Sequence, residues 1–269
     1  STTKAGMALP QTEFFIVDIL SKRPVRVDTG KEPDQHLYVL RWQLDNSELC
    51  FLRVNREFKK LDLMAANPET GATRVLLTET RETFVENIFF PAELDYIFFP
   101  LADGRRLLWR SERDGWYHLY LYNIEGNLLR RLTAGNFPVG QILAVDEKAG
   151  WVYFTAHGDK QRPYDTHLYR VDLNGKGFAR LTEGTGQHRI QFSPSKEFFL
   201  DTHSSTQRPP AVELRTTDGA LLQTLTKANI DALQVVKSPP PEEFVVKAAD
   251  GKTDLYGVLY KPYDFDPRK

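Results

Sequence analysis

A recurring Leu-Thr pair is the feature that most limits the folds open to this sequence. The pair occurs at Leu77-Thr78, Leu132-Thr133, Leu181-Thr182 and Leu225-Thr226. The intervals between the pairs are 55, 49 and 44 residues, close to the length of one four-stranded blade of a β-propeller. Each interval contains short runs rich in Val, Ile, Leu, Phe and Tyr, separated by Gly, Asp and Asn. Such runs predict strands joined by hairpin turns.

The second repeat, which ends at Leu132-Thr133, shows the strand pattern most clearly. Its strand-forming runs cover 96–99, 105–111, 116–122 and 128–132. Asp114-Gly115 lies between the middle two runs and predicts a tight hairpin, because glycine adopts positive φ without steric cost. The same order recurs in the other three repeats, with strands expected at 37–42, 48–55, 58–64, 74–77, 141–145, 151–156, 167–172, 177–181, 189–192, 198–203, 212–216 and 221–225.

This recurrence favours a propeller over an ordinary β-sandwich, in which no four-strand cadence is expected. Two more runs, at 13–17 and 25–28, precede the first blade and predict the outer half of another blade. The fold class expected is therefore all-β: a partial β-propeller with about four complete four-stranded blades plus half a blade.

Composition removes several functional classes. Hydrophobic residues make up 41% of the chain, which is enough for a sizeable core. The 35 Lys and Arg residues nearly balance the 36 Asp and Glu residues, so we expect no nucleic-acid partner. The single cysteine, Cys50, excludes an internal disulfide. No apolar run approaches the ~20 residues of a membrane span, and no charged-then-apolar leader follows Ser1, so any export signal is expected outside this chain.

The last part of the chain departs from the blade pattern. Consecutive prolines at 239–241 predict a stiff, extended linker. Two short runs at 244–248 and 255–260 flank an Asp250-Gly251 turn and predict one hairpin, too little to fold alone. We therefore expect a partial propeller over 1–233, a Pro-rich linker over 234–242 and the truncated start of another domain over 243–269. The chain as a whole is expected to be a fragment of a longer protein.

Three segments now suggest a family. Lys4-Ala5-Gly6, the SERDGWYHLYLY stretch from Ser111 to Tyr122, and the tail from Glu242 to Lys269 resemble the dipeptidyl peptidase IV branch of the prolyl oligopeptidase family. The tail is the most specific of the three, because it resembles the hairpin that opens the α/β-hydrolase domain of that family. The SERDGW type of turn also occurs in non-catalytic propellers of the TolB type, so a propeller that binds protein or peptide is the alternative.

The resemblance implies an eight-bladed propeller that caps a hydrolase domain carrying a Ser-Asp-His triad. Such an enzyme releases dipeptides, typically X-Pro or X-Ala, from the free N-termini of peptide substrates by acyl transfer. The propeller binds the substrate ammonium through two glutamates and restricts access. The resemblance also implies a periplasmic or secreted protein and no cofactor.

The catalytic machinery itself is expected to lie outside this chain. No G-x-S-x-G nucleophile elbow occurs in it, and the resemblance places the triad and the oxyanion tyrosine after Lys269 and the glutamate pair before Ser1. The isolated chain is therefore predicted to be inert. Glu242-Glu243 is the only adjacent glutamate pair, but it follows the proline run and is interpreted as a solvated linker end.

Phe89 and Phe90 are the only candidate substrate-binding residues. They lie where the resemblance places an aromatic side chain that reaches into the cleft; the alternative, which the residues themselves favour, is that they are buried aromatics at a strand end.

The six histidines show no metal-ligand spacing, so no metal is expected. His118 alternates with aromatic residues and is interpreted as structural. The charged run Glu112 to Asp114 predicts either a solvated turn or ion pairs with a neighbouring blade. Blade faces and strand edges left uncovered predict a homodimer or other self-association.

Overall fold

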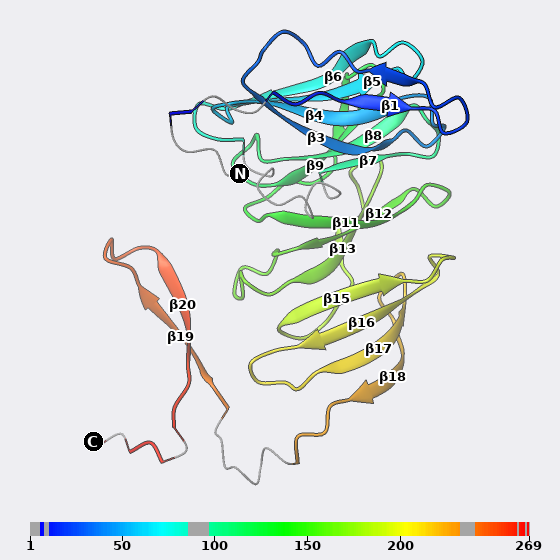
Figure 1. Cartoon of the computed structure of the whole chain (residues 1–269). Helices are drawn as coiled ribbons and strands as arrows, with labels where there is room; N and C mark the ends of the chain where they lie inside the picture. Colours follow the sequence, from blue (N-terminus) through cyan, green and yellow to red (C-terminus); the bar gives the residue numbers. More distant parts are fainter. Residues whose placement is uncertain are drawn as a thin grey trace. The chain divides into compact units, whose positions relative to one another are not determined.

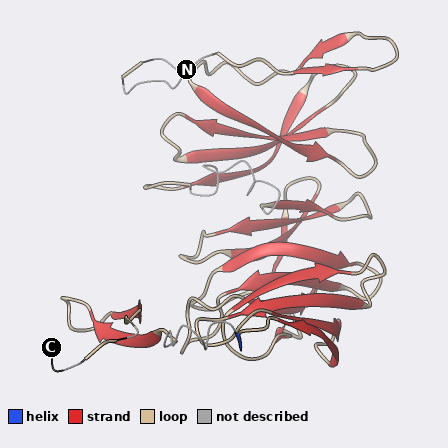
Figure 2. Ribbon diagram, turned by 60° about the horizontal axis from the view of Figure 1, so that its bottom comes forward, coloured by secondary structure: helices blue, strands red, loops and turns tan. Residues whose placement is uncertain are grey.

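The computed structural model describes residues 6–7, 11–85, 97–231, 240–262, 264–266 and 268. The named elements within this part of the chain are all β-strands, which form four four-stranded sheets and two two-stranded ones (Figures 1 and 2). The four larger sheets follow one another along the chain, each built from consecutive strands in their order of sequence. The predicted all-β fold and its count of four blades plus half a blade are confirmed.

The strands lie within three residues of their predicted bounds. The two-stranded sheet before the first blade contains β1 (Phe15–Val17) and β2 (Pro24–Arg26). The first blade contains β3 (Gln35–Trp42), β4 (Leu49–Asn55), β5 (Lys60–Ala66) and β6 (Thr73–Thr80). The second contains β7 (Phe98–Pro100), β8 (Arg106–Ser111), β9 (His118–Asn123) and β10 (Leu128–Arg131).

The later sheets repeat the same arrangement. The third blade contains β11 (Val139–Asp146), β12 (Trp151–Ala156), β13 (His167–Asp172) and β14 (Ala179–Arg180). The fourth contains β15 (Gln187–Phe192), β16 (Phe198–Ser204), β17 (Ala211–Thr216) and β18 (Leu221–Lys227). The C-terminal hairpin contains β19 (Glu242–Lys247) and β20 (Asp254–Leu259).

The chain divides into two compact units. Unit 1 comprises residues 1–156 and 170–179, and unit 2 comprises residues 157–169 and 180–269. The two units differ in which residues contact one another. The division does not test the predicted domain boundaries at 233 and 242, which stay predictions.

The core of unit 1 lies between blades. Leu52 and Leu63 of the first blade pack in one cluster with Phe98, Trp109 and Tyr120 of the second, and each is at most 2% exposed. Burying such large aromatic side chains is the main source of stability for the seam between two blades.

The half blade of β1 and β2 covers the other side of the first blade. Phe14 and Ile16 pack against Phe51 and Met64, and the Phe14 and Phe51 rings meet edge to face at 5.6 Å. The half blade is thus part of the packed core of unit 1.

The recurring Leu-Thr pairs have a structural explanation. Thr133 lies just after the closing strand β10, and its hydroxyl lies 3.0 Å from His118 Nδ1 and accepts the Leu119 backbone N–H at 3.0 Å. The third blade repeats this arrangement at Thr182, which binds His167 Nδ1 and the Leu168 N–H. In the first blade Thr78 donates to Asp62 at 2.6 Å. In these three blades the threonine therefore ties the closing strand to the third strand.

The turn predicted at Asp114-Gly115 is also confirmed. Gly115 has a φ of 91° and its N–H donates to the Glu112 carbonyl, while Ser111 pairs with His118 across the hairpin. A residue with a β-carbon would be strained there.

Candidate functional site

Unit 2 contains a cleft where the C-terminal hairpin meets a loop ahead of β13. The cleft has a volume of about 530 Å³, and its lining comes from 161–165, Gln187, Thr206, 243–245 and 256–258. Tyr164 and Tyr256 meet edge to face across it, with ring centroids 5.7 Å apart. The cleft joins a polar loop of the blades to an apolar strand pair.

An ion pair spans this cleft. Arg162 Nη1 and Nη2 donate to the two carboxylate oxygens of Glu243 at 2.7 and 3.0 Å. Thr206 also donates a short hydrogen bond to this carboxylate. The Arg162 hydrogen bonds, followed by the one from Thr206, lower the pKa of Glu243 to about 2. The interpretation of Glu243 as a solvated linker end is therefore wrong, because the loop ahead of β13 brings an arginine to it.

Glu242 behaves differently from its neighbour. Its carboxylate accepts a hydrogen bond from Lys261 Nζ at 2.6 Å and its side chain is 59% exposed. Both partners belong to the C-terminal segment, so this ion pair makes no link to the blades.

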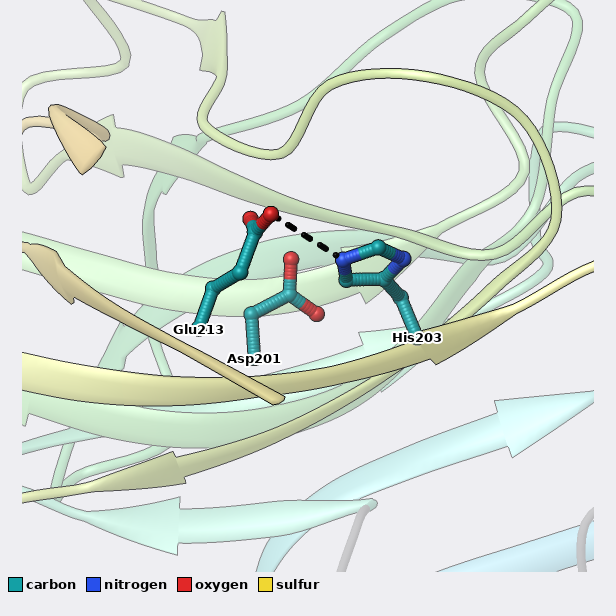
Figure 3. A group of neighbouring side chains, drawn as sticks. All are labelled: Asp201, His203 and Glu213. Carbon is teal, nitrogen blue, oxygen red and sulfur yellow. Dashed lines mark ion pairs between the residues drawn. The ribbon is translucent and has the colours of Figure 1, made fainter. Parts of the chain in front are cut away.

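A second group of polar side chains is buried in the fourth blade. His188 Nδ1 donates to Asp201 at 2.8 Å, and both side chains are fully buried. His203 Nε2 lies 3.4 Å from Glu213 (Figure 3). Arg215, only 5% exposed, donates to Glu213 at 2.7 Å and lies 3.9 Å from Asp201. One guanidinium therefore lies near two carboxylates, the buried one of Asp201 and the half-buried one of Glu213.

Three of the six histidines meet at this place. The His188 ring lies 4.7 Å from the His167 ring and 5.3 Å from the His203 ring, between centroids. His188 on β15 and His203 on β16 lie directly opposite each other in the paired strands. No local spacing of the histidines predicts this cluster, because tertiary packing and the pairing of β15 with β16 bring them together; the register of that strand pair is the one signal for it.

The side chains of Asp201, His203 and Glu213 offer ligand atoms within 4.8 Å of one another (Figure 3). Carboxylates and imidazole are ligands for zinc and related ions. However, the hydrogen bonds of Arg215 lower the pKa of Glu213 against the opposing effect of burial, and His188 occupies Asp201. A cation is thus already present as a guanidinium, and we interpret the cluster as a structural centre.

His167 makes the stability of unit 2 depend on pH. Burial, followed by repulsion from His188 and Arg180, lowers the pKa of His167 to about 4, against the opposing charges of Asp165 and Asp159. The unfolded chain binds this proton near pH 6.5. The stability contributed by neutral His167 is therefore complete above pH 6.5 and is lost as the pH falls from 6.5 to 4.

We expect a His167→Asn variant, which cannot titrate, to lose less stability than the wild type over that interval. Urea midpoints of unit 2 at pH 7.5, 6, 5 and 4 measure the difference. Parallel curves for the two proteins would contradict this assignment.

The charged turn Glu112 to Asp114 links two blades of unit 1. Arg113 Nη2 donates to Glu79 on β6 at 2.7 Å, and its guanidinium lies over the Tyr120 ring at 4.3 Å. Trp109 Nε1, from a side chain 1% exposed, donates to the same Glu79 oxygen at 2.8 Å. Of the two readings of this turn, ion pairing with a neighbouring blade is confirmed.

The other candidates named from the sequence have different outcomes. Phe89 and Phe90 lie outside the described residues. His118 is fully buried, and its Nε2 lies 3.0 Å from the Gly135 carbonyl, so its structural role is confirmed. No helix in the described segments has the length and apolar character needed to span a membrane. Self-association stays a prediction.

Comparison with known proteins identifies the family. A model described as Dipeptidyl peptidase IV (DPP IV) N-terminal region matches residues 3–210, well over half of the chain. The chain belongs to this family. The resemblance inferred from the sequence is thereby confirmed, and the four larger sheets are blades of a dipeptidyl peptidase IV N-terminal propeller.

Individual relatives of the dipeptidyl peptidase IV family agree. Dipeptidyl peptidase 4 of Trichophyton rubrum is 23% identical over 99% of this chain and 35% of its own length. Dipeptidyl peptidase 8 of Homo sapiens is 31% identical over 51% of this chain and 16% of its own length. A putative dipeptidyl aminopeptidase IV from Bacteroides ovatus matches with a TM-score of 0.82 and 27% identity, over 98% of this chain and 39% of that structure. The chain therefore spans about a third of the length of the Trichophyton and Bacteroides relatives.

Proposed function

We propose that this chain is the propeller region of a serine-type dipeptidyl peptidase that removes X-Pro or X-Ala dipeptides from the free N-termini of peptides. In this role the propeller supports an α/β-hydrolase domain and limits access to it. The match to the dipeptidyl peptidase IV N-terminal region over residues 3–210 is the observation that carries the proposal.

The composition of the C-terminal hairpin supports the proposal that a catalytic domain follows the blades. Phe244, Val246 and Leu255 lie on one face of β19–β20, and Val245 and Tyr256 on the other, and each is at least 36% exposed. Strands that are apolar on both faces are typical of sheets covered on both sides, as in α/β domains. A propeller that only binds protein or peptide has no need of such a strand pair.

The propeller's share of substrate binding includes two candidates. Phe89 and Phe90 stay candidates for an aromatic contact with the bound peptide, on the resemblance alone. The triad and the glutamates that bind the substrate ammonium are proposed to belong to the longer protein and to lie outside these 269 residues.

An activity comparison tests the proposal. The protein encoded by the complete reading frame is expected to release the reporter group from Gly-Pro and Ala-Pro substrates, whereas the 269-residue chain is expected to release none. An N-acetylated Gly-Pro reporter is the matched control, because blocking the amine removes the charge that the glutamates would bind. Turnover by the purified chain, or equal turnover of the blocked and free reporters, would refute the proposal.

A further inference from the structure

Glu243 is the point at which the C-terminal hairpin is fixed to the blades of unit 2. Besides the two bonds from Arg162 and the one from Thr206, the neighbouring Pro241 carbonyl accepts a hydrogen bond from Gln207. These partners come from two loops, one before β13 and one between β16 and β17. The contact thus gathers two separate blade loops on one end of β19.

Further hydrogen bonds, separate from those to Glu243, hold Arg162 in place. Its backbone N–H donates to Asp159 Oδ1 at 3.3 Å, and Asp159 Oδ2 in turn pairs with Arg180 at 3.2 Å. The Arg162 Nε donates to Asp165 at 2.6 Å. Arg162 therefore presents its two remaining donor groups in a fixed direction, which suits two-pronged binding of a carboxylate.

Asp165 continues the contact toward the fourth blade. The same oxygen that binds Arg162 accepts the buried Gly186 N–H at 2.8 Å. The backbone N–H of the next residue, Thr166, donates to the Gly186 carbonyl at 3.1 Å, and the Thr166 carbonyl accepts the His188 N–H at 3.1 Å. A continuous series of hydrogen bonds thus joins the hairpin to the interior of the fourth blade.

We expect the position of the hairpin to depend on this contact, to which the Tyr164–Tyr256 ring contact adds. A two-stranded hairpin alone is marginally stable in water, and most of its apolar side chains are exposed. Among the described residues of the hairpin, Glu243 makes the charged contact with the blade loops, whereas the other charged pairs, Lys247–Asp254 and Lys261–Glu242, stay within the C-terminal segment.

We propose that Arg162 and Glu243 form a latch that positions the first hairpin of the catalytic domain on the propeller. Arg162 is then a positioning residue, which sets the relation between the two parts that hold the substrate. The inference rests on the proposed function for its catalytic consequence, whereas the latch itself is a property of this chain.

Hydrogen–deuterium exchange of the full 269-residue chain tests the latch directly. Arg162→Gln and Glu243→Gln are each expected to raise the exchange rates of the β19 and β20 amides several-fold. The double variant is expected to raise them no further than either single variant, because both changes remove the same contact. Glu242→Gln is the matched control and should leave the rates as in the wild type.

Wild-type exchange rates in both single variants, or strictly additive effects in the double variant, would overturn the latch.

Steady-state kinetics of the complete protein test the positioning role. Arg162→Gln is expected to raise KM for a Gly-Pro reporter several-fold and to change kcat less than about twofold, because the reacting groups lie together in one domain while the substrate is held by two. A fall in kcat with KM unchanged would overturn the positioning role. If the complete protein lacked peptidase activity, the proposed function would fail while the exchange measurement would still decide the latch.

Discussion

Glu79→Ala is expected to lower the free energy of unfolding of unit 1 by about 3 kcal/mol. The substitution removes the one oxygen that accepts hydrogen bonds from both Trp109 and Arg113. The Trp109 N–H would then be buried without a partner, and Arg113, 30% exposed, would lose its counter-charge at the seam between two blades. Glu79→Gln keeps an acceptor and is expected to cost about 1 kcal/mol.

Urea unfolding followed by tryptophan fluorescence measures this effect, because all four tryptophans of the chain lie in unit 1. Glu13→Gln is the matched control: Glu13 pairs with Arg26 in the same unit, but the two side chains are 52% and 68% exposed. Its expected cost is at most about 0.5 kcal/mol. Equal midpoints for Glu79→Ala and Glu13→Gln would show that the pairing between blades contributes nothing to stability.

Asp201→Ala is expected to destabilise the fourth blade by about 3 kcal/mol. Asp201 is fully buried and binds His188 Nδ1 through both of its oxygens at 2.9 and 2.8 Å. Without it, His188 has a buried N–H without a partner and Arg215 keeps only one carboxylate, that of Glu213. Asp201→Asn retains one acceptor and is expected to cost about half as much.

Amide exchange at β15 and β16 measures this loss in unit 2. A cost of about 3 kcal/mol corresponds to roughly a hundredfold faster exchange of the amides that open only on unfolding. Arg189→Gln is the control, because Arg189 follows His188 on the same strand but points to solvent; its rates should stay close to the wild type. Unchanged protection in Asp201→Ala would contradict a structural role for the buried cluster.

The strands could be predicted from the sequence because their ends carry their own signals. Asp114-Gly115 and Asp250-Gly251 predict tight turns from local backbone chemistry, and the alternation of apolar residues between such turns predicts strands. The Leu-Thr pairs indicate the blade period, and the hydrogen bonds of Thr133 and Thr182 to histidines explain the pair in the second and third blades.

The polar contacts could not be predicted in the same way. Arg113 and Glu79 lie 34 residues apart and meet only because two blades pack against each other. Arg162 and Glu243 lie 81 residues apart, and local sequence alone gave the wrong interpretation of Glu243. The histidine cluster depends on the register of β15 and β16, which places His188 opposite His203. Contacts of this kind follow from tertiary packing and leave no local pattern.

The mass of the natural protein tests the central claim most directly. Antibodies raised against this 30.9 kDa chain can isolate the protein from its source for intact mass measurement. A propeller joined to a hydrolase domain predicts a species of roughly 80 kDa, with the 269 residues as an internal portion of one polypeptide. A single species near 31 kDa, with no longer polypeptide that carries these residues, would contradict the account and favour a propeller that acts by binding alone.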